Sequence, residues 1–161
     1  MRLRTLLPQD SLHLADLLAR IPTFDAEDRA VAIELVKQAI RNPDQKDYDF
    51  IVAASAAGSV IGYICFGPTP LTYGTYDLYW IAVDPAYTDQ GVGTLLLSAF
   101  EEKVRQVHGR MIIVETSSGP DYEQTRHFYL KNGYHLAETI PDFFHDGEDR
   151  VTYIKRFNTR S

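Results

Sequence analysis

The segment 78–97 constrains this chain most, because an apolar strand runs through a short polar turn into a leucine-rich helix. The turn contains Gln90, Gly91, Val92 and Gly93. Two glycines at this spacing let the backbone pass close to a ligand, and the free N–H groups in the first turn of a helix attract an anion. The sequence therefore predicts a phosphate-binding turn here, with a pyrophosphate as the expected ligand.

The length and composition are those of one globular domain. The chain has 161 residues, of which 45% are hydrophobic and 24% are charged, and a chain of about 150 residues buries about 70% of its unfolded surface. We therefore expect a single domain over 1–161. The longest apolar runs are only several residues long, so no membrane span is expected. The apolar start is short and is broken by Pro8, which argues against a signal peptide and indicates a cytoplasmic protein.

Cysteine, histidine and net charge exclude several classes of function. Cys65 is the only cysteine, so an intrachain disulfide and a multi-cysteine metal site are excluded, and its apolar neighbours predict a buried strand residue. The five histidines show no zinc-ligand spacing, so no metal is expected. The formal net charge of −6 argues against nucleic acid and mildly favours a cationic substrate such as an amine.

Hydrophobic periodicity and turn residues predict the elements of the first half. A strand is predicted at 2–6. A first helix is capped by Asp10, has apolar residues at 12, 14, 17 and 18, and is ended by Pro22, and a second helix runs from about Asp25 to 42–43. Strands at 49–54 and 59–66 and a loop at 67–75 follow. The two strands form an expected antiparallel hairpin. We expect the two helices to cover one face of the sheet.

The second half changes to alternating strands and helices. The predicted elements are a strand at 77–83, a helix at 91–107 with core positions 92, 95, 96, 99, 100, 104 and 107, a strand at 111–115, a helix at 122–132, and strands near 134–139 and 150–157. Gly109 and Gly133 are placed to end the two helices. The first three elements form a βαβ unit with a parallel pair. All four residues of 111–114 are apolar, so both faces of this strand are apolar, as in a strand covered on both sides. The fold is predicted to be α/β with a mixed sheet.

This sequence resembles the GNAT superfamily of acyl-CoA-dependent N-acetyltransferases. The family signature is Arg or Gln, two residues, Gly, one residue, and Gly or Ala, at a strand-to-helix turn. Here it is the segment 88–93, with Thr88 in the first position. Thr88 thus lacks one side-chain contact that the family makes with the cofactor. The resemblance implies antiparallel N-terminal strands, a central βαβ unit whose parallel strands splay apart, and helices on both faces.

A second motif supports the resemblance. The family has an aromatic pair, two residues, and then Asn-Gly-aromatic, which corresponds to 128–134 here. The segment 142–149 is similar to the last hairpin of the ribosomal-protein N-terminal acetyltransferase group. Phe143 and Phe144 stand where that group usually has two tyrosines.

The resemblance implies transfer of an acetyl group from acetyl-CoA to a primary amine by direct attack. The pantetheine is expected between the splayed strands, on the first of which lie Ile81, Ala82 and Val83, and the pyrophosphate on the amides of the turn. The implied cofactor-binding residues are Ile81, Ala82, Val83, Thr88, Asp89, Gln90, Gly91, Val92, Gly93 and Thr94.

The same chemistry needs an acid and a base. Tyr129 matches the family's acid position, and a phenol with a pKa near 10 can protonate a departing thiolate at neutral pH. Glu115 is the best candidate for the base, because it ends an apolar strand beside the splay, where burial would raise the pKa of a carboxylate. Asp77 and His145 are alternatives, as are deprotonation through water and a purely structural role for Glu115.

The acceptor is a small-molecule or peptide amine that this pattern does not identify, and a homodimer is compatible with it. A dinucleotide-binding fold is disfavoured because Leu96 stands where the third glycine belongs. A P-loop NTPase is disfavoured because Gly-Lys-Ser/Thr is absent. A non-catalytic module that binds or senses acyl-CoA is the alternative that remains.

Overall fold

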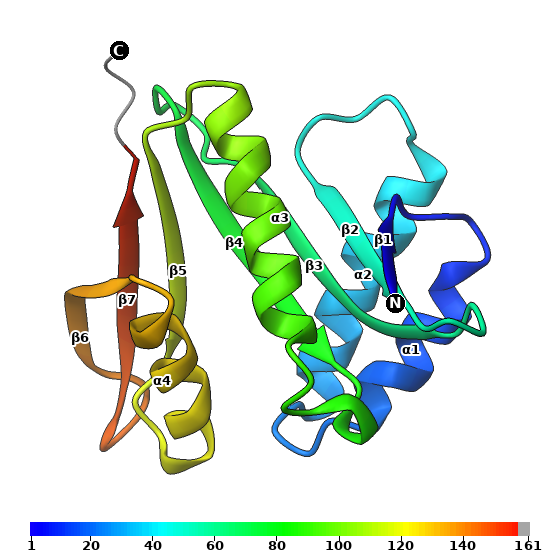
Figure 1. Ribbon diagram of the computed structural model, residues 1–161. Helices are drawn as coiled ribbons and strands as arrows, with labels where there is room; N and C mark the ends of the chain where they lie inside the picture. The colour runs from blue at the N-terminus through cyan, green and yellow to red at the C-terminus, as the bar shows by residue number, and fades with distance from the viewer. Residues whose placement is uncertain (158–161) are drawn as a thin grey trace.

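A single seven-stranded mixed sheet forms the centre of the computed structural model, which describes residues 1–157 (Figure 1). The strand order is β1-β2-β3-β4-β5-β7-β6. The elements are β1 Arg2–Arg4, α1 Asp10–Ala19, α2 Ala26–Arg41, β2 Asp49–Ala54, β3 Val60–Pro68, β4 Thr75–Val83, η1 Pro85–Tyr87, α3 Val92–Gln106, β5 Met111–Ser117, η2 Pro120–Tyr122, α4 Glu123–Lys131, β6 His135–His145 and β7 Glu148–Arg156.

The pairing of β4 with β5 is the one parallel pairing of this sheet. It joins only Thr75–Asp77 to Met111–Ile113, after which the two strands separate. All other neighbouring strands are antiparallel. The predicted mixed α/β fold is confirmed, including the antiparallel N-terminal strands and the βαβ unit with splayed parallel strands.

Helices cover the sheet on both faces, as predicted. In Figure 1, α3 and α4 lie in front of the sheet, whereas α1 and α2 lie behind it. The buried cluster under α1 and α2 includes Leu14, Val36, Tyr63 and Cys65, so the predicted burial of this cysteine is confirmed. The larger cluster on the other face joins α3 to strands β2–β5 and β7, and it includes Phe100, which stacks on Phe66.

The two N-terminal helices begin in different ways. Asp25 caps α2 as predicted, since its carboxylate accepts a 2.8 Å hydrogen bond from the N–H of Asp28 and the reciprocal bond completes a capping box. The prediction that Asp10 caps α1 is wrong. Asp10 is the first helical residue, is 1% exposed, and accepts two hydrogen bonds of 2.8 and 2.9 Å from the guanidinium of Arg4.

The end of α3 also differs from the prediction. The left-handed residue after α3 is His108, with φ of 57°, rather than Gly109. Hydrogen bonds from His108 N–H to Arg105 and from Gly109 N–H to Val104 complete a Schellman motif. Gly109 is needed for space, because a Cβ there would lie 2.5 Å from a Val104 methyl group. Gly133 ends α4 as predicted, with φ of 90°.

Strand β5 is well buried on one face only, which contradicts the prediction of cover on both faces. Ile112 and Val114 are buried, whereas Met111 and Ile113 are only half-buried. The reason is that the cluster under α1 and α2 takes its strand residues from β2, β3 and β4. Two predicted core positions of α3, Leu95 and Val107, are likewise exposed, as is Leu12 in α1.

Candidate active site

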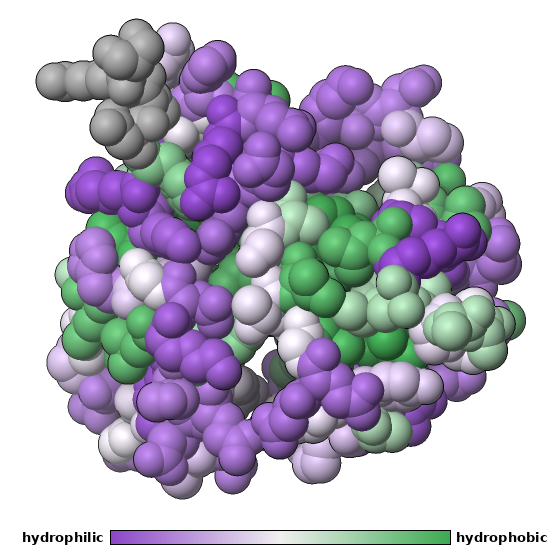
Figure 2. Space-filling view, in the orientation of Figure 1, coloured by the Kyte–Doolittle hydropathy of each residue, from purple (hydrophilic) through white to green (hydrophobic). Residues whose placement is uncertain are grey.

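The splay between β4 and β5 creates the candidate site. Their pairing stops at Asp77 and Ile113, although β4 continues to Val83 and β5 to Ser117. The facing edges beyond that point carry backbone N–H and C=O groups without a strand partner between them, and such groups need hydrogen bonds from a ligand or water. Figure 2 shows an opening in the surface where Figure 1 has the start of α3 on one side and α4 on the other. Ile81, Ala82 and Val83 lie on the open part of β4.

A turn with two left-handed residues leads from β4 into α3. Asp89 has φ of 65° and Gly91 has φ of 80°, and the residues from Thr88 to Gly91 are exposed. Gly91 is the N-cap of α3 and offers no side-chain hydrogen bond. No acceptor within the described residues is found for the N–H groups of Val92, Gly93 and Thr94. These three groups are therefore free to bind an anion at the positive end of the helix dipole.

Helix α4 packs directly against this turn. A Cβ on Gly93 would lie 3.4 Å from the ring of Phe128 and 3.7 Å from a methyl group of Val83. Val92 is 2% exposed as a whole residue and packs into the core, so its side chain is not available to a ligand. The sequence identified Phe128 as part of a motif, but its contact with the turn follows from tertiary packing.

Tyr129 occupies the core beside the cleft. It is 2% exposed and its ring lies near the rings of Tyr134 and Tyr153. Its hydroxyl makes no hydrogen bond to the described residues. Unlike the hydroxyl of Tyr63, it is not completely buried, so it retains some contact with solvent. Burial raises the pKa of Tyr129 well above that of a free phenol, so the hydroxyl keeps its proton at neutral pH.

Glu115 lies in a different environment from the one predicted. Its side chain is 49% exposed and lies 3.6 Å from Arg150, on the half-covered face of β5. The expected burial of this carboxylate is therefore wrong. The same guanidinium lies 3.3 Å from Glu138 and over the ring of Phe143. Glu115 thus belongs to a surface cluster of two carboxylates, one guanidinium and one aromatic ring.

The two alternative bases each have a hydrogen-bond or ion-pair partner. Asp77 accepts a 2.7 Å hydrogen bond from the hydroxyl of Thr69, at the point where β4 and β5 separate. His145 is 72% exposed and pairs with Glu148 in the β6–β7 hairpin.

Hydrogen bonds clamp the loop between β5 and α4, a feature that the sequence did not reveal. Ser117 donates a 2.6 Å hydrogen bond to Glu148, and Ser118 Oγ accepts one from the N–H of Asp149. Arg126 donates to the carbonyl groups of Ser117 and Gly119 at 2.8 and 2.7 Å. Nη1 of Arg126 is therefore bound to the loop, and the hairpin β6–β7 is held beside the splay.

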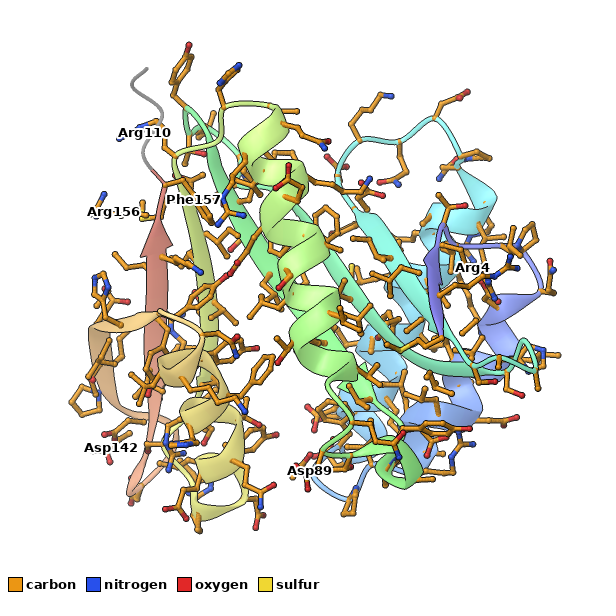
Figure 3. All side chains as sticks on the ribbon, viewed as in Figure 1. Arg4, Asp89, Arg110, Asp142, Arg156 and Phe157 are labelled. Carbon is orange, nitrogen blue, oxygen red and sulfur yellow. The ribbon has the colours of Figure 1, made fainter. Side chains whose placement is uncertain are left out.

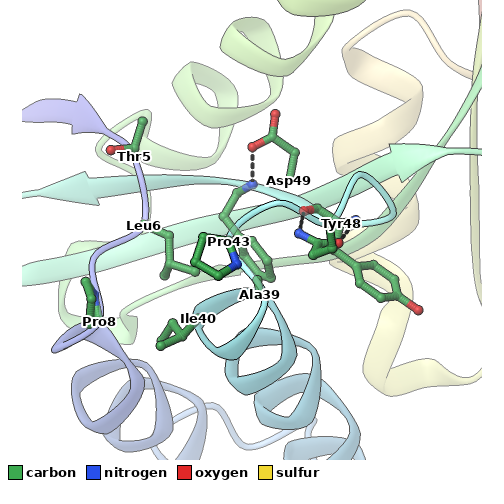
Figure 4. Close-up of a pocket in the computed structure, with 10 residues that line it drawn as sticks. Thr5, Leu6, Pro8, Ala39, Ile40, Pro43, Tyr48 and Asp49 are labelled. Carbon is green, nitrogen blue, oxygen red and sulfur yellow. Dashed lines mark hydrogen bonds between the residues drawn. The ribbon is translucent and has the colours of Figure 1, made fainter.

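Two surface pockets lie outside the splay. One, of about 270 Å³, lies between the segment before α1, the end of α2 and the start of β2, and contains none of the predicted site residues (Figure 4). A second, of about 190 Å³, touches Gln90 and Val92. Among residues 1–157, no three His, Cys, Asp or Glu side chains are grouped to hold a metal ion. No helix in that range is long and apolar enough to cross a bilayer.

Comparison with known proteins identifies the family. The model of the acetyltransferase (GNAT) family matches residues 13–134. The chain belongs to the GNAT acetyltransferase family. A GNAT-family acetyltransferase from Desulfovibrio desulfuricans, solved at 1.85 Å, is 36% identical with a TM-score of 0.92. That alignment covers 96% of this chain and 98% of the other.

Other matches have lower identity. YdhI of Bacillus subtilis (strain 168) is 30% identical over 96 residues, so the match spans 60% of this chain and 56% of that relative. An aminoglycoside 6′-N-acetyltransferase complexed with coenzyme A is 19% identical, with a TM-score of 0.76 and coverage of 100% and 99%. The ribosomal-protein-S18-alanine N-acetyltransferase from Escherichia coli is 15% identical, with a TM-score of 0.78 and coverage of 99% and 96%. These two likenesses concern the fold.

Proposed function

We propose that this chain is a single N-acetyltransferase domain that moves an acetyl group from acetyl-CoA to a primary amine by direct attack. The observation that carries the proposal is the open splay between β4 and β5, which leads to the uncapped first turn of α3. An extended pantetheine offers amide groups to the free strand edges, and the first turn of α3 offers N–H groups to a pyrophosphate. Acetyl-CoA supplies the activated acetyl group.

The cofactor contacts divide into two sets. Ile81, Ala82 and Val83 would bind the pantetheine through backbone groups, since they lie on the unpaired part of β4. The pyrophosphate would be bound by the turn 88–94, chiefly by the amides of Val92, Gly93 and Thr94. The short side chain of Thr88 leaves the turn dependent on the backbone.

Tyr129 is the proposed acid. Its buried ring fixes the position of the phenol, and its raised pKa keeps the proton available until a thiolate forms. A free hydroxyl without a protein partner can donate its hydrogen bond to a ligand.

Glu115 is the proposed acceptor of the ammonium proton, directly or through water. Its carboxylate is exposed on the face of β5 that α1 and α2 leave uncovered, so an amine can approach it without entering the apolar core. Arg150 holds it from the neighbouring strand β7.

The experiment that tests the function measures thermal stability with acetyl-CoA, CoA, NAD and ATP in parallel. A ligand at about 100 times its Kd stabilises a protein by about 2.7 kcal/mol. We expect a shift with acetyl-CoA and CoA alone, followed by thiol release with members of an amine panel. No shift with either ligand would refute the proposal. Binding of acetyl-CoA without transfer to any amine would instead indicate a non-catalytic acyl-CoA-binding module.

A further inference from the structure

The turn at the start of α3 has no basic side chain of its own. No Lys or Arg occurs between Lys46 and Lys103, a stretch that contains β2, β3, β4 and the whole turn. Its first signature position is Thr88, and the next residue, Asp89, is acidic. The chain also carries a formal net charge of −6. CoA is strongly anionic, so backbone amides alone would have to hold its phosphates within an acidic protein.

Cations from other segments near the turn already have partners. Arg20 donates a 2.7 Å hydrogen bond to Asp84, just before η1. Arg126 donates to two loop carbonyl groups through Nη1, and Lys155 lies within 3.2 Å of both carboxylate oxygens of Glu101. Arg110 and Arg156 lie at the opposite end of the molecule from Asp89 (Figure 3).

Lys131 differs from these side chains. It is exposed, and it makes no hydrogen bond or ion pair with the residues that the structure describes. Lys131 follows Phe128 by three residues, and side chains at this spacing are neighbours on a helix, with Cβ atoms about 5–6 Å apart. The ring of Phe128 meets the Cβ position of Gly93 in the first turn of α3. Lys131 is therefore a cation without a partner among the described residues, and it lies about one helical turn from Phe128, whose ring contacts the anion-binding turn.

We propose that Lys131 binds a phosphate group of CoA and supplies, from α4, the side-chain contact that Thr88 cannot make at the turn. The inference rests on the proposed function of the cleft. A lysine ammonium is a compact point charge on a flexible stem, which suits a phosphate whose position is fixed by other groups. Lys131 would act in binding and in no chemical step.

Calorimetric titration of CoA, dephospho-CoA and pantetheine tests this role. We expect Lys131→Ala to weaken CoA binding about tenfold, as for loss of one charge-assisted hydrogen bond. Lys131→Arg should retain CoA affinity within about threefold. Added salt should weaken CoA binding to the wild type more steeply than to Lys131→Ala. Pantetheine has no phosphate, so its binding should be equal in all variants. Lys103→Ala is the matched control. Lys103 lies near the far end of α3 from the turn and pairs with Asp49, so this variant should bind CoA normally.

The dephospho-CoA titration identifies the phosphate. If Lys131→Ala weakens dephospho-CoA as much as CoA, the contact is with the pyrophosphate, and if only CoA is weakened, it is with the 3′-phosphate. Equal CoA affinity of Lys131→Ala and wild type would overturn this inference alone. Equal weakening of CoA and pantetheine would also overturn it, because it would indicate a structural effect. A wild type that binds neither CoA nor pantetheine would overturn the proposed function itself.

Discussion

The ring of Phe128 lies 3.4 Å from the position that a Cβ of Gly93 would occupy. This contact joins the two motifs of the sequence, because Gly93 belongs to the turn before α3 and Phe128 to α4. It places α4 against the first turn of α3. Since Val83 also lies 3.7 Å from the same position, the space at Gly93 is bounded on two sides.

Gly93→Val should therefore disturb the site, whereas Gly93→Ala should not. A single Cβ fits at ordinary contact distance, but the added methyl groups of valine would push against Phe128 and cost about 1–3 kcal/mol. We expect CoA affinity to fall at least about tenfold in Gly93→Val and to stay within about twofold in Gly93→Ala. Calorimetry on variants first checked for folding measures this. A folded valine variant with normal CoA affinity would show that the cofactor does not approach this turn.

Gly91→Ala should separate backbone strain from ligand binding. Gly91 has φ of 80° and Gly147 has φ of 85°, and no atom lies within 4 Å of a Cβ at either position. Alanine at either site should cost about 1–2 kcal/mol. Thermal unfolding should show similar losses for Gly91→Ala and Gly147→Ala, and only Gly91→Ala should lose the stabilisation by CoA. If both variants kept that stabilisation, the conformation of the turn would not matter for binding.

Tyr129→Phe should lower kcat about 100-fold and leave the Kd for acetyl-CoA unchanged. The hydroxyl makes no hydrogen bond to the described residues, so its removal should change the free energy of unfolding by less than about 0.5 kcal/mol. Because burial places the pKa of Tyr129 well above neutral, its titration should add no alkaline limb to the pH–rate profile below pH 9. Tyr153→Phe, whose ring lies 6.2 Å away, is the control. Unchanged turnover in Tyr129→Phe would remove this residue from the mechanism.

Glu115→Gln should lower kcat/KM at neutral pH at least about tenfold. Glu138→Gln offers a matched control, because Glu138 lies 3.3 Å from the same Arg150 and has similar exposure. Steady-state kinetics from pH 5 to 9 would compare the two variants. Identical profiles for Glu115→Gln and Glu138→Gln would assign Glu115 a structural role.

The pair Arg4–Asp10 should give the fold part of its acid sensitivity. Burial opposes ionisation of Asp10, but hydrogen bonds from Arg4 and from the N–H of Leu7, together with the charge of Arg4, outweigh it and lower the pKa of Asp10. A lowered pKa stabilises the fold above the unfolded value, about 3.9, and this contribution is lost as the pH falls further. We expect Arg4→Met to cost about 3–5 kcal/mol at pH 7.

The double variant with Arg4→Met and Asp10→Asn isolates this contribution. It should show a shallower loss of stability between about pH 4 and pH 2 than the wild type. Urea unfolding at each pH measures the difference. An equally steep loss in the double variant would mean that other carboxylates account for the acid sensitivity.

Local features of the chain were predictable because they depend on neighbouring residues. Asp25 and Asp28 form a capping box with no other partner needed, and Gly133 takes the left-handed conformation that ends α4. The order of elements and the turn before α3 could likewise be read from spacing and periodicity. The prediction that Gly109 takes the left-handed conformation at the end of α3 was wrong, because His108 takes it. Gly109 is required instead for space, since a side chain there would clash with a methyl group of Val104.

The sequence by itself determined the strand–turn–helix unit and the family motifs, because short-range sterics and helix-end hydrogen bonding depend on a few consecutive residues. Only the tertiary structure decided the surroundings of the candidate site residues. Glu115 is exposed because α1 and α2 cover β2–β4 but not β5, and Arg150 reaches it because β7 lies between β5 and β6. Burial and charge pairing depend on which distant segments pack together, and local patterns do not specify that packing.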